Sequence, residues 1–162
     1  MMSRDEVYAV LATVPDPEVP AISVVDLGII RDVVVTEDNI RVTVTPTYSG
    51  CPAMREIEDD IRSALVAAGA PAVAIDTVYA PAWTTDWMTD TAREKLRAYG
   101  IAPPGPAEHG GLITLSRRAA PVACPFCGST KTRLQSEFGS TACKAIHVCQ
   151  SCRQPFDEFK AI

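Results

Sequence analysis

The chain has 162 residues, of which 47% are hydrophobic and 22% are charged, and its formal net charge is −5. This composition is typical of a folded globular protein and excludes a largely disordered chain. The first residues contain no apolar segment of the signal-peptide kind, and no stretch is long and apolar enough to span a bilayer. The sequence therefore predicts a cytoplasmic protein without membrane contacts.

The net charge is distributed unevenly along the chain. Residues 1–116 carry 8 Lys and Arg against 17 Asp and Glu, whereas residues 117–162 carry 7 against 3. This difference indicates two modules. Because phosphate contacts need a basic face, the acidic part argues against nucleic-acid binding, which stays open only for the basic C-terminal part.

The N-terminal part begins with a predicted helix and two strands. Ser3 and Glu6 have the spacing of a capping box, and apolar residues then repeat at helical spacing until Pro15 ends the helix. Residues 29–35 are rich in β-branched side chains, and residues 40–45 alternate apolar and polar side chains. Both segments are predicted strands.

A second helix is predicted to begin at Cys51-Pro52, because proline suits the first helical position. A third strand is predicted over residues 73–79 and a final helix over residues 85–99. The fold class is therefore α/β (α+β), with a small mixed three-stranded sheet and helices in a domain of residues 1–102.

Residues 103–122 form a predicted linker, rich in proline and glycine, in which residues 112–115 could make one short strand. The remaining module, residues 123–162, is predicted to be a zinc ribbon. It contains two Cys-x-x-Cys pairs, and a pair with this spacing can direct both sulfur atoms at one ion. The predicted ligands are Cys124, Cys127, Cys149 and Cys152.

The predicted metal is zinc, although two cysteine pairs can also bind iron or an iron–sulfur cluster. Two strands, over residues 130–138 and 144–148, are expected between the pairs. Cys143 is either a strand or turn residue near the site, an alternative ligand or a reactive thiol. His147 is interpreted as a solvent-facing strand residue, with a ligand role as the alternative, and His109 receives no role.

Cys51 is the single cysteine of the first domain, and no histidine occurs in residues 1–108. At a helix start, its thiolate could act as a nucleophile, a metal ligand or a sulfur acceptor, or the side chain could simply be buried. Without a histidine base, metal or sulfur handling is favoured over acyl transfer. Asp16, Glu18 and Asp26 either support this thiol or serve as turn and capping residues.

Three segments resemble the family of cytosolic iron–sulfur assembly factors: Asp16-Pro17-Glu18, residues 25–30 from Val25 to Ile30, and residues 45–52 ending in Gly50-Cys51-Pro52. The resemblance implies a small α/β fold in which Cys51 serves metal or cluster transfer. Asp16, Glu18 and Asp26 match the motif and would have a supporting part.

Residues 81–88 and 93–104, together with Cys124 to Ser129, residues 138–145 and Pro155-Phe156, resemble the D subunits of the bacterial phenylacetyl-CoA epoxidase. This second resemblance covers nearly the whole chain. It implies an accessory protein of phenylacetate catabolism that is not the oxygenase and that matures or maintains metal centres of its partners. The implied partners are the oxygenase and iron–sulfur reductase subunits, and a transient iron–sulfur cluster is an implied cofactor beside zinc.

Two further questions follow from this resemblance. A cluster held by Cys51 would need more ligands, which a homodimer or a partner could supply. The alternative function is a structural or adaptor subunit that binds zinc only.

Trp83 and Trp87, in the connection before the last helix, either anchor a partner or cover the core of the domain.

Overall fold

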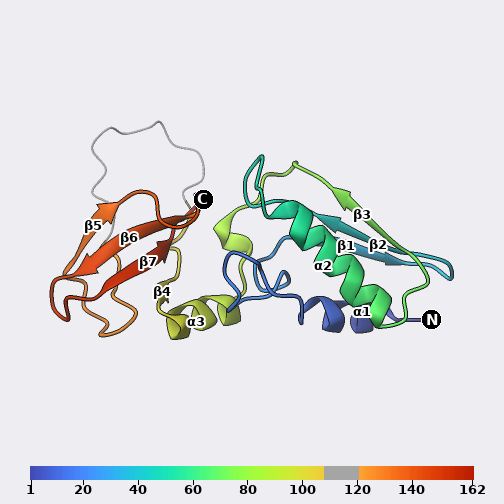
Figure 1. Ribbon diagram of the computed structural model, residues 1–162, viewed down its shortest axis with the longest axis horizontal. Coiled ribbons are helices and arrows are strands. Elements are labelled where there is room, and N and C mark those ends of the chain that lie inside the picture. Colours follow the sequence, from blue (N-terminus) through green and yellow to red (C-terminus); the bar gives the residue numbers. More distant parts are fainter. Residues whose placement is uncertain (108–120) are drawn as a thin grey trace. The chain divides into compact units, whose positions relative to one another are not determined.

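The computed structural model describes residues 1–107 and 121–162, so His109 and the strand predicted over residues 112–115 lie outside the described residues. The chain divides into two compact units, Met1–Ala92 and Arg93–Ile162 (Figure 1). This division precedes the predicted boundary at residue 102, because residues 101–102 pair with a strand of the second unit. Within the described part of the chain, every helix is too short or too polar to cross a membrane.

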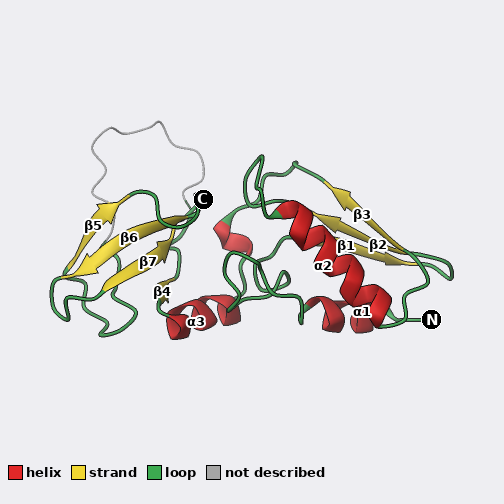
Figure 2. Cartoon of the chain, viewed as in Figure 1, coloured by secondary structure: helices red, strands yellow, loops and turns green. Residues whose placement is uncertain are grey.

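The first unit contains a mixed three-stranded sheet, which confirms the predicted fold class (Figure 2). Strands β1 and β2 form an antiparallel hairpin, and β3 lies parallel to β2 on its other side. A parallel neighbour needs a crossover connection, which α2 provides here. The elements are α1 (Arg4–Leu11), β1 (Ile30–Val35), β2 (Ile40–Val44), α2 (Met54–Ala67) and β3 (Val73–Thr77).

One face of this sheet forms the core together with the two helices. In β2, Ile40, Val42 and Val44 are buried, while Arg41 between them is exposed. Helix α1 packs on β1, and α2 packs on β3. The helices contribute buried side chains at helical spacing: Val7, Leu11, Ile57, Ile61 and Leu65. The alternating and helical spacings therefore place these buried side chains on the faces that meet in the core.

Helix α1 begins as predicted and ends earlier than predicted. Ser3 and Glu6 form the reciprocal capping box, with the Glu6 N–H donating to the Ser3 hydroxyl at 3.2 Å. The helix ends at Leu11 because the Thr13 backbone N–H and hydroxyl both donate to the carbonyl oxygen of Val10, at 2.9 and 2.7 Å. This tight turn replaces the last helical turn that was expected before Pro15.

The helix predicted over residues 85–99 is two elements. A short 3₁₀-helix, Thr85–Trp87, is followed by α3, Asp90–Tyr99. The break occurs because Thr89 donates its N–H to the carbonyl oxygen of Asp26 at 3.1 Å and accepts the Ala92 N–H on its hydroxyl at 3.0 Å. Thr89 thus caps a new helix, whose last residue Tyr99 is 60% exposed.

The second unit contains a four-stranded sheet in the order β4-β7-β6-β5. Strands β5, β6 and β7 are antiparallel neighbours, and β4 lies parallel to β7. Strands β5 and β6 match the two predicted strands, whereas β4 and β7 were not predicted. Their bounds are β4 Ile101–Ala102, β5 Thr132–Ser136, β6 Lys144–Cys149 and β7 Pro155–Phe159.

A pair of substitutions in α2 tests this packing. Leu65 is fully buried and its neighbour Val66 is 54% exposed. We expect Leu65→Ala to lower the free energy of unfolding by about 2–5 kcal/mol, because it removes a buried side chain and leaves a cavity. Val66→Ala should change it by less than about 0.5 kcal/mol. Urea unfolding followed by circular dichroism measures both, and equal effects would contradict the packing described.

Candidate functional site: a four-cysteine centre and a separate loop thiol

Four cysteine sulfur atoms meet in the second unit. The Sγ atoms of Cys124, Cys127, Cys149 and Cys152 all lie within 4.8 Å of one another. The Sγ–Sγ distance is 3.7 Å between Cys124 and Cys152 and 3.6 Å between Cys127 and Cys149. All four are free cysteines. The two Cys-x-x-Cys pairs, far apart in the sequence, therefore form one group of ligands.

Two turns of matching construction present these sulfur atoms. In each turn, the N–H of the first cysteine donates to a carbonyl five residues on: Cys124 to Ser129 and Cys149 to Gln154, both at 3.0 Å. The residue after the second cysteine has a positive φ in each turn, 73° at Gly128 and 63° at Arg153. The matching construction explains how each turn directs both of its sulfur atoms to the same point.

Hydrogen bonds also join the two turns to each other. The hydroxyl groups of Ser129 and Ser151 are 2.8 Å apart, and the Gln150 N–H donates to the carbonyl oxygen of Lys131 at 2.8 Å. These contacts bring the turns together through groups other than sulfur. The protein's own hydrogen bonds therefore help to fix the spacing of the four ligands.

The sulfur atoms fit a tetrahedral metal ion. A Zn–S bond of about 2.3 Å in tetrahedral geometry places sulfur atoms about 3.8 Å apart, close to the two distances given above. Four thiolates also provide the donor set of structural zinc sites and of several iron sites. The second unit therefore contains a metal-binding centre.

The cysteine thiols of this centre differ in acidity. The Cys152 N–H donates to Sγ of Cys149 at 3.5 Å, and this bond, together with the Ser151 N–H and the neighbouring cysteine thiols, lowers the pKa of the Cys149 thiol to about 6. At Cys152, the N–H of Gln154 lowers the pKa, but burial and the neighbouring cysteines outweigh it and raise the pKa to about 12. Cys149 is therefore the first of these two ligands to ionise.

Cys143 and His147 lie outside the four-sulfur group. The Cys143 side chain is buried, and its sulfur lies 3.0 Å from the Thr141 hydroxyl. The interpretation of His147 as solvent-facing was wrong, because the side chain is buried, its Nε2 lies 2.6 Å from a Glu158 oxygen and its ring stacks on Phe156. It faces inward because it pairs with Phe156 across β6 and β7.

Metal content distinguishes the ligands from the nearby thiol. Because Cys149 belongs to the four-sulfur group and Cys143 does not, we expect Cys149→Ser to lose the metal and Cys143→Ser to keep it. Elemental analysis of the purified, dialysed variants measures this. Loss of metal from Cys143→Ser in a folded protein would place Cys143 among the ligands.

Metal retention should depend on pH in one direction. Protons compete with a metal for thiolates, and Cys149, with a pKa of about 6 in the folded protein, keeps its thiolate above that value. We expect the protein to retain its metal against a chromophoric chelator at neutral pH. Retention should fall as the pH decreases below the pKa of Cys149, because a bound metal opposes protonation of the thiolates and moves their loss to lower pH. Retention that does not depend on pH over the whole range in which the protein stays folded would contradict this assignment.

Cys51 is positioned by the loop between β2 and α2. Its N–H donates to the carbonyl oxygen of Tyr48, and its own carbonyl accepts from Met54, both at 3.3 Å. Gly50, with a φ of 78°, allows the tight turn just before it. The Cys51 side chain is half-buried, whereas Gly50 and Pro52 are exposed.

The prediction that a helix begins at Cys51-Pro52 was wrong. Helix α2 begins at Met54, and the Ile57 N–H makes a helical hydrogen bond to the Ala53 carbonyl. The contact between Met54 and Cys51 spans only three residues, so Pro52 and Ala53 form a separate turn ahead of the helix. The effect of a helix dipole falls off within the first turn, so Cys51 feels less of it than predicted.

The three acidic residues predicted near Cys51 have structural contacts of their own. Asp16 is buried, and one of its oxygens accepts the N–H groups of Glu18 and Val19 at 2.9 and 2.7 Å. Asp26 accepts the Ser23 N–H at 3.1 Å and the Thr89 hydroxyl at 3.5 Å. These bonds support the turn and capping interpretation, while the supporting role toward Cys51 stays a prediction.

The two tryptophans take different positions. Trp83 is buried, and its indole N–H donates to the carbonyl oxygen of Leu27 at 3.0 Å, so it covers the core. Trp87 is half-buried, and the guanidinium of Arg31 lies 3.7 Å from the centre of one of its rings. Gly28 makes this arrangement possible, because its φ is 77° and a Cβ there would collide with the carbonyl of Trp87.

Comparison with known proteins matches two parts of the chain to described families. Residues 109–160 match the family described as PaaD zinc beta ribbon domain, and residues 4–77 match the family described as iron-sulfur cluster assembly protein. A candidate D subunit of the 1,2-phenylacetyl-CoA epoxidase from Escherichia coli is 48% identical over 97% of this chain and 92% of its own length. The chain belongs to the family of phenylacetyl-CoA epoxidase D subunits.

The first unit has relatives of its own. An Fe-S protein maturation auxiliary factor of Porphyromonas gingivalis is 36% identical over 59% of this chain and 92% of its own length. The crystal structure of a DUF59 domain from Bacillus anthracis is 30% identical, covers 57% of this chain and 89% of its own, and has a TM-score of 0.53. A conserved hypothetical protein of Thermotoga maritima gives 0.51, at 29% identity over 59% and 94% of the two chains.

Several residues that shape the centre were not found from the sequence. A positive φ is common for glycine, as at Gly128, but its counterpart Arg153 belongs to a residue type that rarely adopts one, so the sequence does not indicate the matching turn. Ser129 and Ser151 are ordinary turn residues in sequence, and only their position after Cys127 and between Cys149 and Cys152 could have indicated that they connect the turns.

Proposed function

We propose that this protein is an accessory, non-oxygenase factor of the phenylacetyl-CoA epoxidase system. In this role it matures or maintains iron–sulfur or iron centres of the oxygenase and reductase subunits. The observation that carries the proposal is the 48% identity to an epoxidase D subunit along nearly the whole chain. The match of residues 4–77 to the iron-sulfur cluster assembly family, which includes Cys51, supports the kind of chemistry.

Cys51 is the thiol that handles the metal in this proposal. It lies on a turn, half-buried, between the exposed residues Gly50 and Pro52, so an incoming group can approach it. One thiolate is a single ligand, whereas a cluster needs about four. The client protein or a second copy of the chain supplies the others, so that binding at Cys51 is transient and transfer is favoured over storage.

The four-cysteine centre has a different role. We assign it a zinc ion bound by Cys124, Cys127, Cys149 and Cys152, because the sulfur spacing fits tetrahedral zinc. Bound zinc would offset two of the four thiolate charges and add its binding free energy to the stability of the second unit. With four protein ligands the site is closed, which is typical of structural zinc and not of catalytic zinc.

The residues present also support a non-enzymatic role. A di-iron oxygenase needs Glu-x-x-His pairs on facing helices, and this sequence contains none. The usual general base for a thiol nucleophile is a histidine, and residues 1–108 contain none. Residues 1–108 therefore offer Cys51 no histidine of the kind that acyl transfer uses.

A substitution at Cys51 tests the proposed function. In cells that lack the native gene, we expect Cys51→Ser to abolish growth on phenylacetate, and the partner subunits should contain less iron and sulfide. The thiol is half-buried and lies outside the four-sulfur group, so the variant should fold and bind zinc as the parent does. Growth, iron content of the purified epoxidase subunits and zinc content of the variant measure these outcomes.

Cys143→Ser is the matched control, because it removes a thiol that is buried and outside the four-sulfur group. We expect this variant to support growth. Normal growth and full iron content with Cys51→Ser would refute metal transfer. They would leave an adaptor that binds zinc only and holds the other epoxidase components together.

A further inference from the structure

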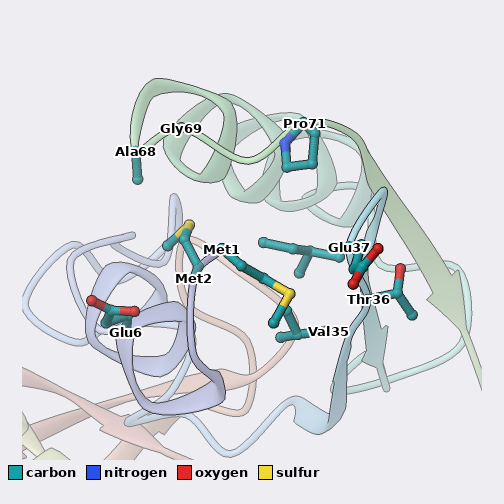
Figure 3. Close-up of a pocket in the computed structure, with 10 residues that line it drawn as sticks. Met1, Met2, Glu6, Val35, Thr36, Glu37, Ala68, Gly69 and Pro71 are labelled. Atoms are coloured by element: carbon teal, nitrogen blue, oxygen red, sulfur yellow. The ribbon is translucent and has the colours of Figure 1, made fainter.

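An open groove lies at one end of the first unit, away from the residues discussed so far (Figure 3). It has a volume of about 670 Å³ and is formed by the chain start, the β1–β2 hairpin and the turn after α2. Its lining comprises Met1, Met2, Glu6, Val35, Thr36, Glu37, Ile40, Ala68, Gly69 and Pro71. Most of these side chains are apolar.

The groove is separate from Cys51. Helix α2 begins at Met54, just after Cys51, and ends at Ala67, beside the groove residue Ala68. Fourteen helical residues at about 1.5 Å each separate its ends by roughly 21 Å. Strand β2 runs in the opposite direction between the same two places, since Ile40 at its start lines the groove and its other end leads into the Cys51 loop.

The groove combines adaptable apolar groups with an acidic rim. Methionine side chains are flexible and polarisable, and they suit surfaces that accept varied apolar groups. Met2 lies on the same side of the groove as Glu6, and the Met1 side chain extends from there toward Val35 (Figure 3). Glu37 is exposed on the hairpin turn at the rim.

Glu6 contributes a second negative charge. Its carboxylate accepts the Ser3 N–H at 2.7 Å, and this bond and the Ser3 hydroxyl lower its pKa, so it is ionised at neutral pH. Glu6 also lies near the positively charged α-amino group of Met1, so the groove presents two carboxylates and one amine next to an apolar surface.

The charge of the whole unit points to the same kind of partner. Residues 1–92 contain 15 Asp and Glu, 5 Arg and no Lys, a net charge of −10. Three of the arginines form ion pairs within the unit, Arg4 with Asp32, Arg41 with Asp76 and Arg62 with Asp59, and Arg31 stacks on Trp87. Four of the five arginines thus have an acidic or aromatic partner within the unit. The excess of negative charge on the unit attracts a cationic partner.

We propose that this groove docks a short protein segment in which apolar side chains are flanked by lysine or arginine. The apolar side chains fill the space between the methionines, Val35 and Pro71, and the flanking cations face Glu6 and Glu37. Charge complementarity with the unit selects this occupant over an acidic or uncharged segment. The docking surface is independent of the chemistry at Cys51, so the two can be tested apart.

The probe is a fluorescein-labelled peptide in which two leucines are flanked on each side by two lysines. The control peptide has glutamate at the lysine positions. We expect the full-length protein to raise the fluorescence anisotropy of the basic peptide, less so at high salt, and to leave the acidic peptide unchanged. Equal binding of the two peptides would refute the proposal.

Two substitutions in the groove locate the binding. Ala68→Lys places a long cationic side chain in the groove, and a cation is favourable at a helix C-terminus, so the protein should fold. We expect it to abolish binding of the basic peptide. Glu37→Lys, on an exposed turn, should weaken binding about fivefold, because one attraction becomes a repulsion.

Asp60→Lys is the matched control for Glu37→Lys, since both replace a carboxylate with a cation. Asp60 is exposed on α2, roughly 12 Å along the helix from Ala68. It should change the affinity by less than about twofold, because the distance exceeds the screening length. Cys51→Ser should bind the peptide as the parent does, whether or not it transfers metal.

Three outcomes would overturn the proposal. Undiminished binding by Ala68→Lys would place the peptide elsewhere. An equal loss in Asp60→Lys and Glu37→Lys would show attraction to the whole unit without a defined site. Self-association of the parent that Ala68→Lys removes, seen by sedimentation, would make a second copy of the chain the occupant.

Discussion

The construction of the second unit depends on four sulfur atoms that must lie within bonding distance of one ion. The buried cluster around them consists of Ala102, Cys124, Cys149 and Phe156, with Val122 and Cys152 packed against it. Cysteines thus occupy positions that aliphatic side chains fill in larger domains. A unit of this size buries little apolar surface, so the metal's binding free energy replaces part of a hydrophobic core.

The first unit is stabilised by an ordinary hydrophobic core, and its single thiol lies in a loop outside that core. The alternation of β2 and the stripes of α1 and α2 bury enough aliphatic side chains to form a sheet covered by helices. The chain then leaves β2 through a loop that ends in Gly50 and Cys51. The cysteines of the second unit therefore include a four-sulfur group, whereas the single cysteine of the first unit lies half-buried on a turn.

Much of the fold could be predicted because local signals and tertiary packing agree. The capping box of Ser3 and Glu6 and the alternation of residues 40–44 gave the correct elements, and the two Cys-x-x-Cys pairs gave the four-sulfur group. Each of these patterns involves residues close together in the sequence. Each therefore indicates its own element or turn without knowledge of distant contacts.

The failures have a common physical origin in contacts between distant residues. Thr89 interrupts a helical pattern because its N–H bonds to Asp26, which is 63 residues away. Strand β4 is two residues long and exists only because β7 lies beside it. His147 is buried because Glu158 and Phe156 surround it on the neighbouring strand. None of these partners can be identified from local composition.

The different surroundings of the six cysteines have a chemical consequence. Four are grouped around the metal-binding centre, and Cys143 is buried at 4% exposure, whereas Cys51 is half-buried on a turn with exposed neighbours. Alkylating reagents react with accessible, uncoordinated thiolates. With the centre loaded, Cys51 is therefore the position at which the native protein accepts a spin label or fluorophore, without removal of any other cysteine.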